Sequence, residues 1–282
     1  SRRAAGDQHI PMLPTVKVVQ ADVHDDAALA ALVAGRDAVI NLVAILHGSE
    51  AQFEQVHVEL PKRLARACAA TGVRRIVYVS ALGAAPDAPS KYQRSKARGE
   101  AALMGSGLDV TVLRPSTIFG EHDRFMNLFA RLQAWLPLMP LGGADAQFQP
   151  VWVDDVADAI VRCLDDRTTI GQTIECTGPE VLTLRELVRR AGRWSGHPRP
   201  VIALPDALAR LQARVMEWLP GAPLLSRDNL DSMKRPNVAS GELPGLARLG
   251  IVPTPIEAVM APVLGRHSPE ARLDLWRAAG RH

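Results

Sequence analysis

Runs of apolar residues alternate with helical segments along the first 120 residues, and this alternation constrains the fold more than any other feature. Residues 38–45, 76–80 and 108–113 are apolar and largely β-branched, which is typical of strands buried on both faces. A shorter strand is expected at residues 16–19. Helical patterns lie between these runs, so the sequence predicts an α/β fold with a doubly wound parallel sheet and helices on both faces.

Several residues predict where helices begin. Pro61 falls inside a helical pattern, where it should either kink the helix or start its second half. Asp154 or Asp155 is expected to cap the helix that follows Trp152. Thr183 and Glu186 have the spacing of a capping box and predict a helix start there.

The character of the chain changes after Gly120. Proline and glycine become frequent, and the chain breaks into short helical pieces. We therefore predict a larger domain over residues 1–120 and 150–178, and a smaller, mostly helical domain over residues 121–149 and 179–282.

Tyr92 and Lys96 are the first candidates for chemistry. Their spacing of four places the phenol and the ammonium on one helical face. A nearby ammonium favours the phenolate and lowers the pKa of the phenol, and a phenol tuned in this way can exchange a proton with a substrate. Ser80, at the end of the preceding strand, is the third candidate. The pair alone is a weak signal, because an exposed helix can carry the same two residues by chance.

Composition limits the class of protein. Of the 282 residues, 47% are hydrophobic and 22% charged, and the net charge is +3, as in an ordinary globular protein. The positive charge is spread along the chain without a basic run, which argues against a nucleic-acid partner. No apolar run reaches membrane-spanning length. The three cysteines lack metal-binding spacing and are expected to be reduced and buried.

The order of several short motifs resembles the extended and atypical short-chain dehydrogenase/reductases, which include the NAD-dependent epimerases and dehydratases. Within this superfamily the chain looks most like the subgroup of the nucleotide-binding accessory subunit of respiratory complex I. The resemblance covers nearly the whole chain. Its pieces are Ala21-Asp-Val23, Asn41-Leu-Val-Ala44, Val79-Ser-Ala-Leu-Gly-Ala84, Tyr92-x-x-x-Lys96, Leu113-Arg-Pro115 through Gly120, Val153-Asp-Asp-Val156, Gly178-Pro-Glu180, Ser226-Arg-Asp-Asn-Leu230 and Leu249 through Thr254.

This resemblance implies a Rossmann-type sheet, an NAD(P) cofactor and a set of roles. Tyr92 would donate or accept the proton, Lys96 would hold the ribose and tune Tyr92, and Ser80 would lie beneath the nicotinamide. Arginines in place of an acidic ribose partner favour NADP over NAD. The implied cofactor contacts are Arg2 and Arg3 at the 2′-phosphate, Asp22 and Val23 at the adenine, Asn41, Leu42, Val43 and Ala44 in the groove, Lys96 at the ribose, and Pro115, Ser116, Thr117 and Ile118 beside the nicotinamide.

The sequence departs from the family pattern twice. The usual first strand and its G-x-x-G-x-x-G turn, whose glycines let the backbone meet the pyrophosphate, do not occur in these 282 residues. We therefore expect the chain to be part of a longer protein. Leu82 occupies the place where the catalytic enzymes often carry the active serine or threonine, which weakens the prediction of catalysis.

Three functions stay open from the sequence. The first is an NAD(P)-dependent oxidoreductase, epimerase or dehydratase with Tyr92 as acid/base. The second is a non-catalytic nucleotide-binding accessory or assembly protein related to respiratory complex I. The third is a cofactor-dependent step in quinone or lipid metabolism. The expected partners are an unidentified small-molecule substrate and a respiratory complex or membrane surface, in the cytoplasm or at the periphery of the inner membrane.

Overall fold

The computed structural model describes residues 15–218, 221 and 223–266. Its central sheet has four parallel strands in the order β1-β2-β3-β8. These are β1 (Ala38–Asn41), β2 (Arg75–Val79), β3 (Asp109–Pro115) and β8 (Thr173–Cys176). The predicted Rossmann-type parallel sheet is therefore confirmed.

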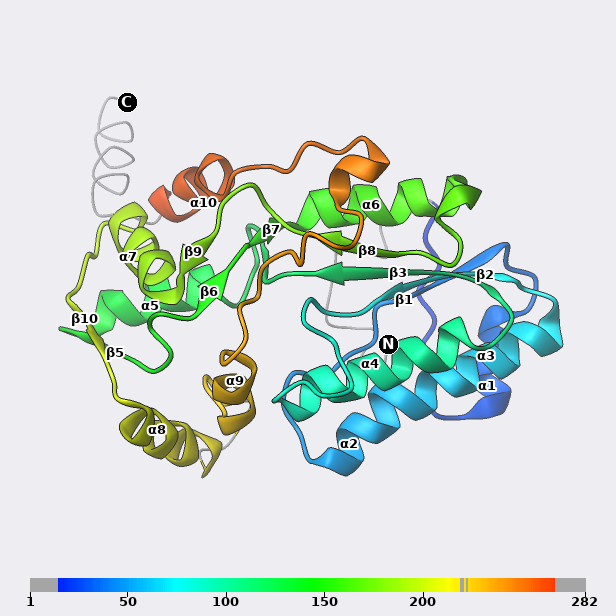
Figure 1. The fold of residues 1–282 in the computed structure, drawn as a ribbon, viewed down its shortest axis with the longest axis horizontal. Helices are drawn as coiled ribbons and strands as arrows, with labels where there is room; N and C mark the ends of the chain where they lie inside the picture. Colours follow the sequence, from blue (N-terminus) through cyan, green and yellow to red (C-terminus); the bar gives the residue numbers. More distant parts are fainter. Residues whose placement is uncertain (1–14, 219–220, 222, 267–282) are drawn as a thin grey trace, which may run out of the picture.

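Helices cover both faces of this sheet (Figure 1). One face carries α1 (Asp26–Val33), α2 (Glu50–Glu54), α3 (Leu60–Thr71) and α4 (Lys91–Met104), and the other carries α6 (Val153–Asp165). The alternation along β2 explains the two layers, because Ile76 and Tyr78 pack with α1 and α3 while Val77 packs with α6. Both clusters are mostly aliphatic and almost fully buried.

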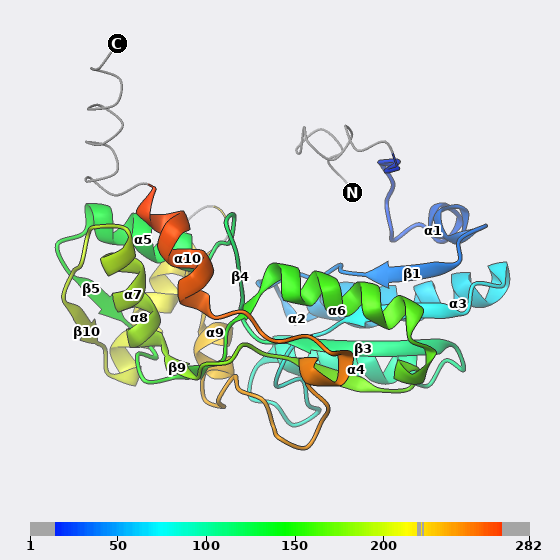
Figure 2. The same ribbon diagram turned by 90° about the horizontal axis from the view of Figure 1, so that it is seen from above.

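A second group of elements lies beyond the carboxyl ends of the strands, as both ribbon views show (Figures 1 and 2). Its helices are α5 (Met126–Trp135), α7 (Leu184–Trp194), α8 (Asp206–Trp218), α9 (Arg227–Ser232) and α10 (Ile256–Gly265). Its own core is shared by α5, α7 and α10. The short strands are β4 (Ile118–Phe119) with β7 (Val151–Trp152), β5 (Met139–Leu141) with β10 (Val201–Ala203), and β6 (Gln147–Phe148) with β9 (Leu182–Thr183).

The chain between α9 and α10 returns to the sheet. A single-turn 3-10 helix, Leu246–Leu249, packs with α6 and β8 in the same cluster as Ile251. Residues from the C-terminal third of the sequence therefore contribute to the core of the sheet as well as to the second group of elements.

The helix-start predictions have mixed outcomes. Pro61 lies in the first turn of α3, directly after a π-helical segment, Gln55–Glu59. The capping box of Thr183 and Glu186 at α7 is confirmed. The prediction for α6 is wrong, because Trp152 occupies the N-cap without a side-chain bond. Asp155 lies in the first turn instead, and its carboxylate accepts hydrogen bonds from the backbone and hydroxyl of Thr254.

Residues 16–19 do not form the predicted strand. The segment has no regular secondary structure, and Val16, Val18 and Val19 are 40%, 37% and 38% exposed. β-branched residues favour a strand mainly where the strand has a face to bury, and these valines bury little. The strand predicted over residues 38–45 is also shorter, since pairing in β1 ends at Asn41.

Candidate functional site at the carboxyl ends of the strands

Two polar side chains end neighbouring strands of the sheet. Asn41 is the last residue of β1, and Ser80 directly follows β2. Both are buried, and within the described residues neither Asn41 Nδ2 nor Ser80 Oγ has a hydrogen-bond partner. Buried polar groups are almost always paired in folded proteins, so these two atoms have bonding capacity left for a ligand.

This location fits a nucleotide. In open parallel α/β sheets, ligands bind outside the carboxyl ends of the strands. Asn41 Nδ2 is a donor and Ser80 Oγ is both donor and acceptor, which suits ribose hydroxyls and amide groups. The residues present therefore fit a dinucleotide along this edge of the sheet.

The loop after β1 is held from both ends. Asn41 Oδ1 accepts a hydrogen bond from Val43 N (3.0 Å), and His57 Nε2 accepts one from Ile45 N (3.0 Å). The side chains of Leu42, Val43 and Ala44 between these points are exposed. The backbone of this predicted cofactor groove is therefore fixed by two side-chain acceptors rather than by packing.

Helix α4, which carries Tyr92 and Lys96, has two caps. Ser90 Oγ accepts from Gln93 N (3.1 Å). The carboxylate of Asp228, from α9, accepts from Lys91 N (2.7 Å) and Tyr92 N (3.1 Å). An anion at a helix N-terminus satisfies free amides and the helix dipole together. The second group of elements is thereby attached to the helix that carries Tyr92.

Lys96 does not act on Tyr92 in the predicted way. Its Nζ donates to Val79 O (2.8 Å) and lies 4.6 Å from the centre of the Tyr78 ring. Burial, partly offset by the nearby Glu100, lowers the pKa of Lys96 to about 8. Burial raises the pKa of Tyr92 to about 12, so the expectation of a lowered phenol pKa is wrong. Tyr92 packs against the rings of Phe53 and His57, and burial disfavours the charged phenolate.

Two of the residues predicted to border the nicotinamide, Ser116 and Thr117, form hydrogen bonds with a side chain that is distant in the sequence. Asn237 Oδ1 accepts from Ser116 Oγ (2.5 Å) and Thr117 N (3.3 Å), and Asn237 Nδ2 donates to Leu82 O (3.4 Å). Pro115 ends β3 and Ile118 begins β4. One amide therefore joins the turn after β3 to the turn after β2.

The remaining predicted cofactor contacts precede the strand β1 in the sequence. Asp22 Oδ1 accepts from His24 N (3.0 Å) in the turn before α1, and the half-buried Val23 packs on the cluster beneath the sheet. Arg2 and Arg3 lie outside the described residues. Their predicted contact with a 2′-phosphate stays a prediction.

Sequence reasoning missed five residues that build this region. They are His57, Asp228, Asn237 and the ion pair of Glu100 with Arg114, whose guanidinium binds the carboxylate through Nε (3.0 Å) and a terminal nitrogen (2.5 Å). Arg114 stands in the quoted Leu-Arg-Pro motif and lies within the buried strand β3, so its charge was a usable signal. Asp228 stands in the quoted Ser226–Leu230 motif, but it lies 136 residues from its amide partner Tyr92, and Asn237 lies 120 residues from Thr117. Nothing local in the sequence indicated either contact.

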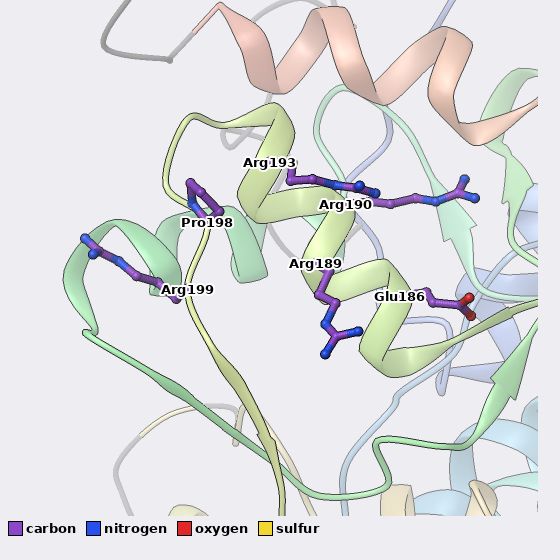
Figure 3. A pocket seen from close by; sticks show the side chains of 6 residues that line it. All are labelled: Glu186, Arg189, Arg190, Arg193, Pro198 and Arg199. Atoms are coloured by element: carbon purple, nitrogen blue, oxygen red, sulfur yellow. The ribbon is translucent and has the colours of Figure 1, made fainter.

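A hollow of about 400 Å³ lies elsewhere, on α7 (Figure 3). Arg190 is paired with Glu180 (2.9 Å). Arg190 and Arg193 extend in one direction from α7, whereas Arg199 points in the opposite direction (Figure 3). The guanidinium groups do not converge on one point. The lining residues are Glu186, Arg189, Arg190, Arg193, Pro198 and Arg199.

The part of the chain that the structure describes holds no group of three or more His, Cys, Asp or Glu side chains placed to bind a metal ion. None of its helices combines the length and the hydrophobicity that crossing a bilayer requires.

Comparison with known proteins places this geometry in a family. Residues 2–167 match the family model described as NAD(P)H-binding. The chain is 34% identical over 253 residues to the mouse mitochondrial NADH dehydrogenase [ubiquinone] 1 alpha subcomplex subunit 9, covering 87% of this chain and 66% of that protein. The predicted resemblance to a subunit of the respiratory NADH dehydrogenase is confirmed, although the chain spans slightly less than two thirds of that relative.

Solved structures agree on the fold. The NADPH-dependent quinone oxidoreductase of Escherichia coli, solved with NADPH, superposes with a TM-score of 0.69 at 19% identity, covering 89% of this chain and 83% of that one. A nucleoside-diphosphate-sugar epimerase from Staphylococcus aureus gives 0.67 at 15% identity, with coverages of 88% and 84%. With the family model matching more than half of its residues, the chain belongs to the NAD(P)H-binding family.

Proposed function

We propose that this protein is a nucleotide-holding accessory subunit of a respiratory NADH dehydrogenase, in which NAD(P) is retained as part of the structure and is not turned over. The observation that carries the proposal is the state of the Tyr92 helix. Lys96 is bonded to Val79 O, and burial raises the pKa of Tyr92 to about 12. A general acid/base works best with a pKa near the operating pH, and this phenol is far from it.

The position of Asn237 supports the same reading. Its amide bonds both Ser116 and the backbone of Leu82, beside the predicted nicotinamide position. Asp228 and the ion pair of Arg235 with Asp87 (2.8 Å) attach the same C-terminal segment to the sheet region. A protein that exchanges substrate and cofactor in every cycle needs these contacts between the C-terminal segment and the sheet region to open. A protein that retains its nucleotide is stabilised by keeping them closed.

The proposed nucleotide contacts follow from the sequence and the strand ends. Asn41 Nδ2 and Ser80 Oγ would bond the nucleotide, and Lys96 would lie near its ribose. Arg2 and Arg3 would select NADP over NAD through the 2′-phosphate. A bound nicotinamide supplies the capacity for hydride transfer. In this protein Leu82 stands where the catalytic enzymes often carry the active serine or threonine, so one hydroxyl group that supports hydride transfer is missing.

The proposed partner is the respiratory enzyme itself. The mouse relative is named as one of its subunits, and 87% of this chain aligns with it. We therefore propose that the protein is bound to that complex at the periphery of the inner membrane.

The test uses protein expressed from its complete reading frame. After purification, the nucleotide released by denaturation is identified and counted. We expect about one NADP(H) per chain, no steady consumption of NADPH with quinone or carbonyl acceptors, and co-purification with NADH dehydrogenase subunits from native membranes. Sustained NADPH oxidation by the isolated protein would overturn the proposal.

A second candidate is an NAD(P)H-dependent reductase, epimerase or dehydratase with Tyr92 as acid/base. Tyr92 and Lys96 at family spacing, together with the unpartnered hydroxyl of Ser80, favour it. A step in quinone or lipid metabolism is one form of this candidate, consistent with the name of the E. coli neighbour. It requires turnover that depends on Tyr92, which the same assay measures.

A further inference from the structure

We propose that His57 is a positioning residue that holds the loop after β1 in the conformation that receives the nucleotide. The inference rests on the proposed function, because it assigns the loop at residues 42–45 to the nucleotide site. His57 is not one of the residues implied by the family motifs. It lies between the loop and helix α4 and bonds both.

His57 lies in the π-helical segment between α2 and α3 and is fully buried. Its Nε2 accepts from Ile45 N (3.0 Å), and its Nδ1 bonds Ser95 Oγ (2.8 Å). Single π turns within helices occur often at functional sites. Here the wider turn carries the imidazole that spans from the loop to α4.

The hydrogen-bond partners assign the protonation state of the ring. A backbone amide can only donate, so Nε2 is an acceptor and carries no proton. The proton of the neutral ring is therefore on Nδ1 and is donated to Ser95 Oγ. The hydroxyl of Ser95 in turn donates to Tyr92 O (2.8 Å). A continuous chain of bonds runs from the loop amide through His57 and Ser95 to the backbone of Tyr92.

The loop depends on this contact because, among the described residues, few other contacts hold it. Leu42, Val43 and Ala44 are exposed, and Leu42 is 62% exposed. Asn41 fixes the start of the loop at Val43 N and His57 fixes its end at Ile45 N. Without the hydrogen bond from Ile45 N to His57, the loop that would lie along the nucleotide is free to move. Nucleotide binding must then order the loop, and the lost conformational entropy weakens the affinity.

Three substitutions separate the two bonds of His57. The amide of His57→Gln reaches the place of Nε2 and can accept from Ile45 N, but loses Ser95. The amide of His57→Asn reaches the place of Nδ1 and keeps Ser95, but loses Ile45. His57→Phe keeps a ring and loses both bonds. Gln and Asn each remove one buried bond, so a purely structural role predicts similar effects for the two.

The experiment measures NADPH affinity by calorimetric titration and amide hydrogen exchange at Ile45, on protein from the complete reading frame. We expect His57→Gln to bind within about threefold of the unmodified protein. His57→Asn and His57→Phe should bind about tenfold more weakly, the size of one lost hydrogen bond, with faster exchange at Ile45. His57→Asn keeps the test valid if His57→Phe does not fold.

The outcomes are distinguishable. Equal affinity in His57→Asn and His57→Gln, with tight binding in the unmodified protein, overturns the role of His57 and leaves the nucleotide function standing. Failure of the unmodified protein to bind any nucleotide overturns the proposed function and the inference together. Unchanged exchange at Ile45 in His57→Asn also overturns the inference.

Discussion

Replacing Gly99 with alanine should disrupt the contact on which the Tyr92 helix depends. Gly99 lies inside α4, where a Cβ would stand 2.0 Å from the backbone carbonyl oxygen of His57 and 2.9 Å from the Tyr78 hydroxyl. Ordinary van der Waals contact begins near 3.4 Å. The carbonyl belongs to a helix backbone and cannot rotate away, so the two helices would have to move apart by more than about 1 Å.

The magnitude follows from two opposing effects. Overpacking of this kind costs about 1–3 kcal/mol or more, while glycine to alanine in a helix gains about 1 kcal/mol in propensity. Since the nearest atom is backbone and Gly99 is buried, the upper end of the cost applies. We expect Gly99→Ala to lower the free energy of unfolding by about 2 kcal/mol.

Urea unfolding followed by circular dichroism measures this loss. Gly105→Ala is the matched control, at the end of the same helix, where φ is −80° and the nearest atom to a Cβ is Ala101 O at 3.1 Å. The control should change stability by less than about 0.5 kcal/mol. If Gly99→Ala proves as stable as Gly105→Ala, the close packing of α4 on the π-helical segment is wrong.

Three further predictions concern the same region. Burial, with a smaller effect of Lys96, lowers the pKa of His57 from 6.5 to about 3, so the unfolded chain binds this proton first. The free energy of unfolding should then fall as the pH drops from 6.5 towards 3, by up to about 1.4 kcal/mol per pH unit. Urea unfolding at a series of acid pH values should show that His57→Gln lacks this pH-dependent loss. The same dependence of stability on pH in both proteins would contradict the buried neutral imidazole. Asp228→Ala removes the carboxylate that accepts from Lys91 N and Tyr92 N and should cost about 1–2 kcal/mol in urea unfolding, whereas an unchanged midpoint would show that water replaces the cap. Tyr92→Phe should leave nucleotide retention unchanged, as measured by nucleotide released per chain; a loss of any turnover by about 10²–10⁴-fold would instead support the catalytic candidate.

The sheet could be predicted because its signals are local. Val77 and its neighbours form an uninterrupted apolar run that only a doubly covered strand accommodates. Pro61 and the Thr183–Glu186 box likewise act within one turn of helix. The prediction of a strand at residues 16–19 was wrong because β-branched composition does not show whether the strand would have a face to bury.

The site was predictable only in part, because its geometry depends on distant segments. The apolar run over residues 76–80 predicts Ser80 at a strand end, and helical spacing places Tyr92 and Lys96 on one helical face. Asn41 is predicted inside a strand over residues 38–45, whereas it ends β1. Spacing did not reveal that Lys96 would bond Val79 O, since that depends on how α4 packs over β2. The approach of Asn237 to Ser116, 121 residues earlier, depends on the return of the C-terminal segment to the sheet.

The central claim is that this protein retains a nicotinamide nucleotide without turning it over. The most direct measurement is a single-turnover experiment on protein from the complete reading frame, loaded with NADPH and followed at the absorbance of the reduced nicotinamide after a quinone is added. The account predicts that the bound NADPH stays reduced and remains with the protein through repeated gel filtration. Rapid oxidation followed by release of NADP, abolished by Tyr92→Phe, would contradict it.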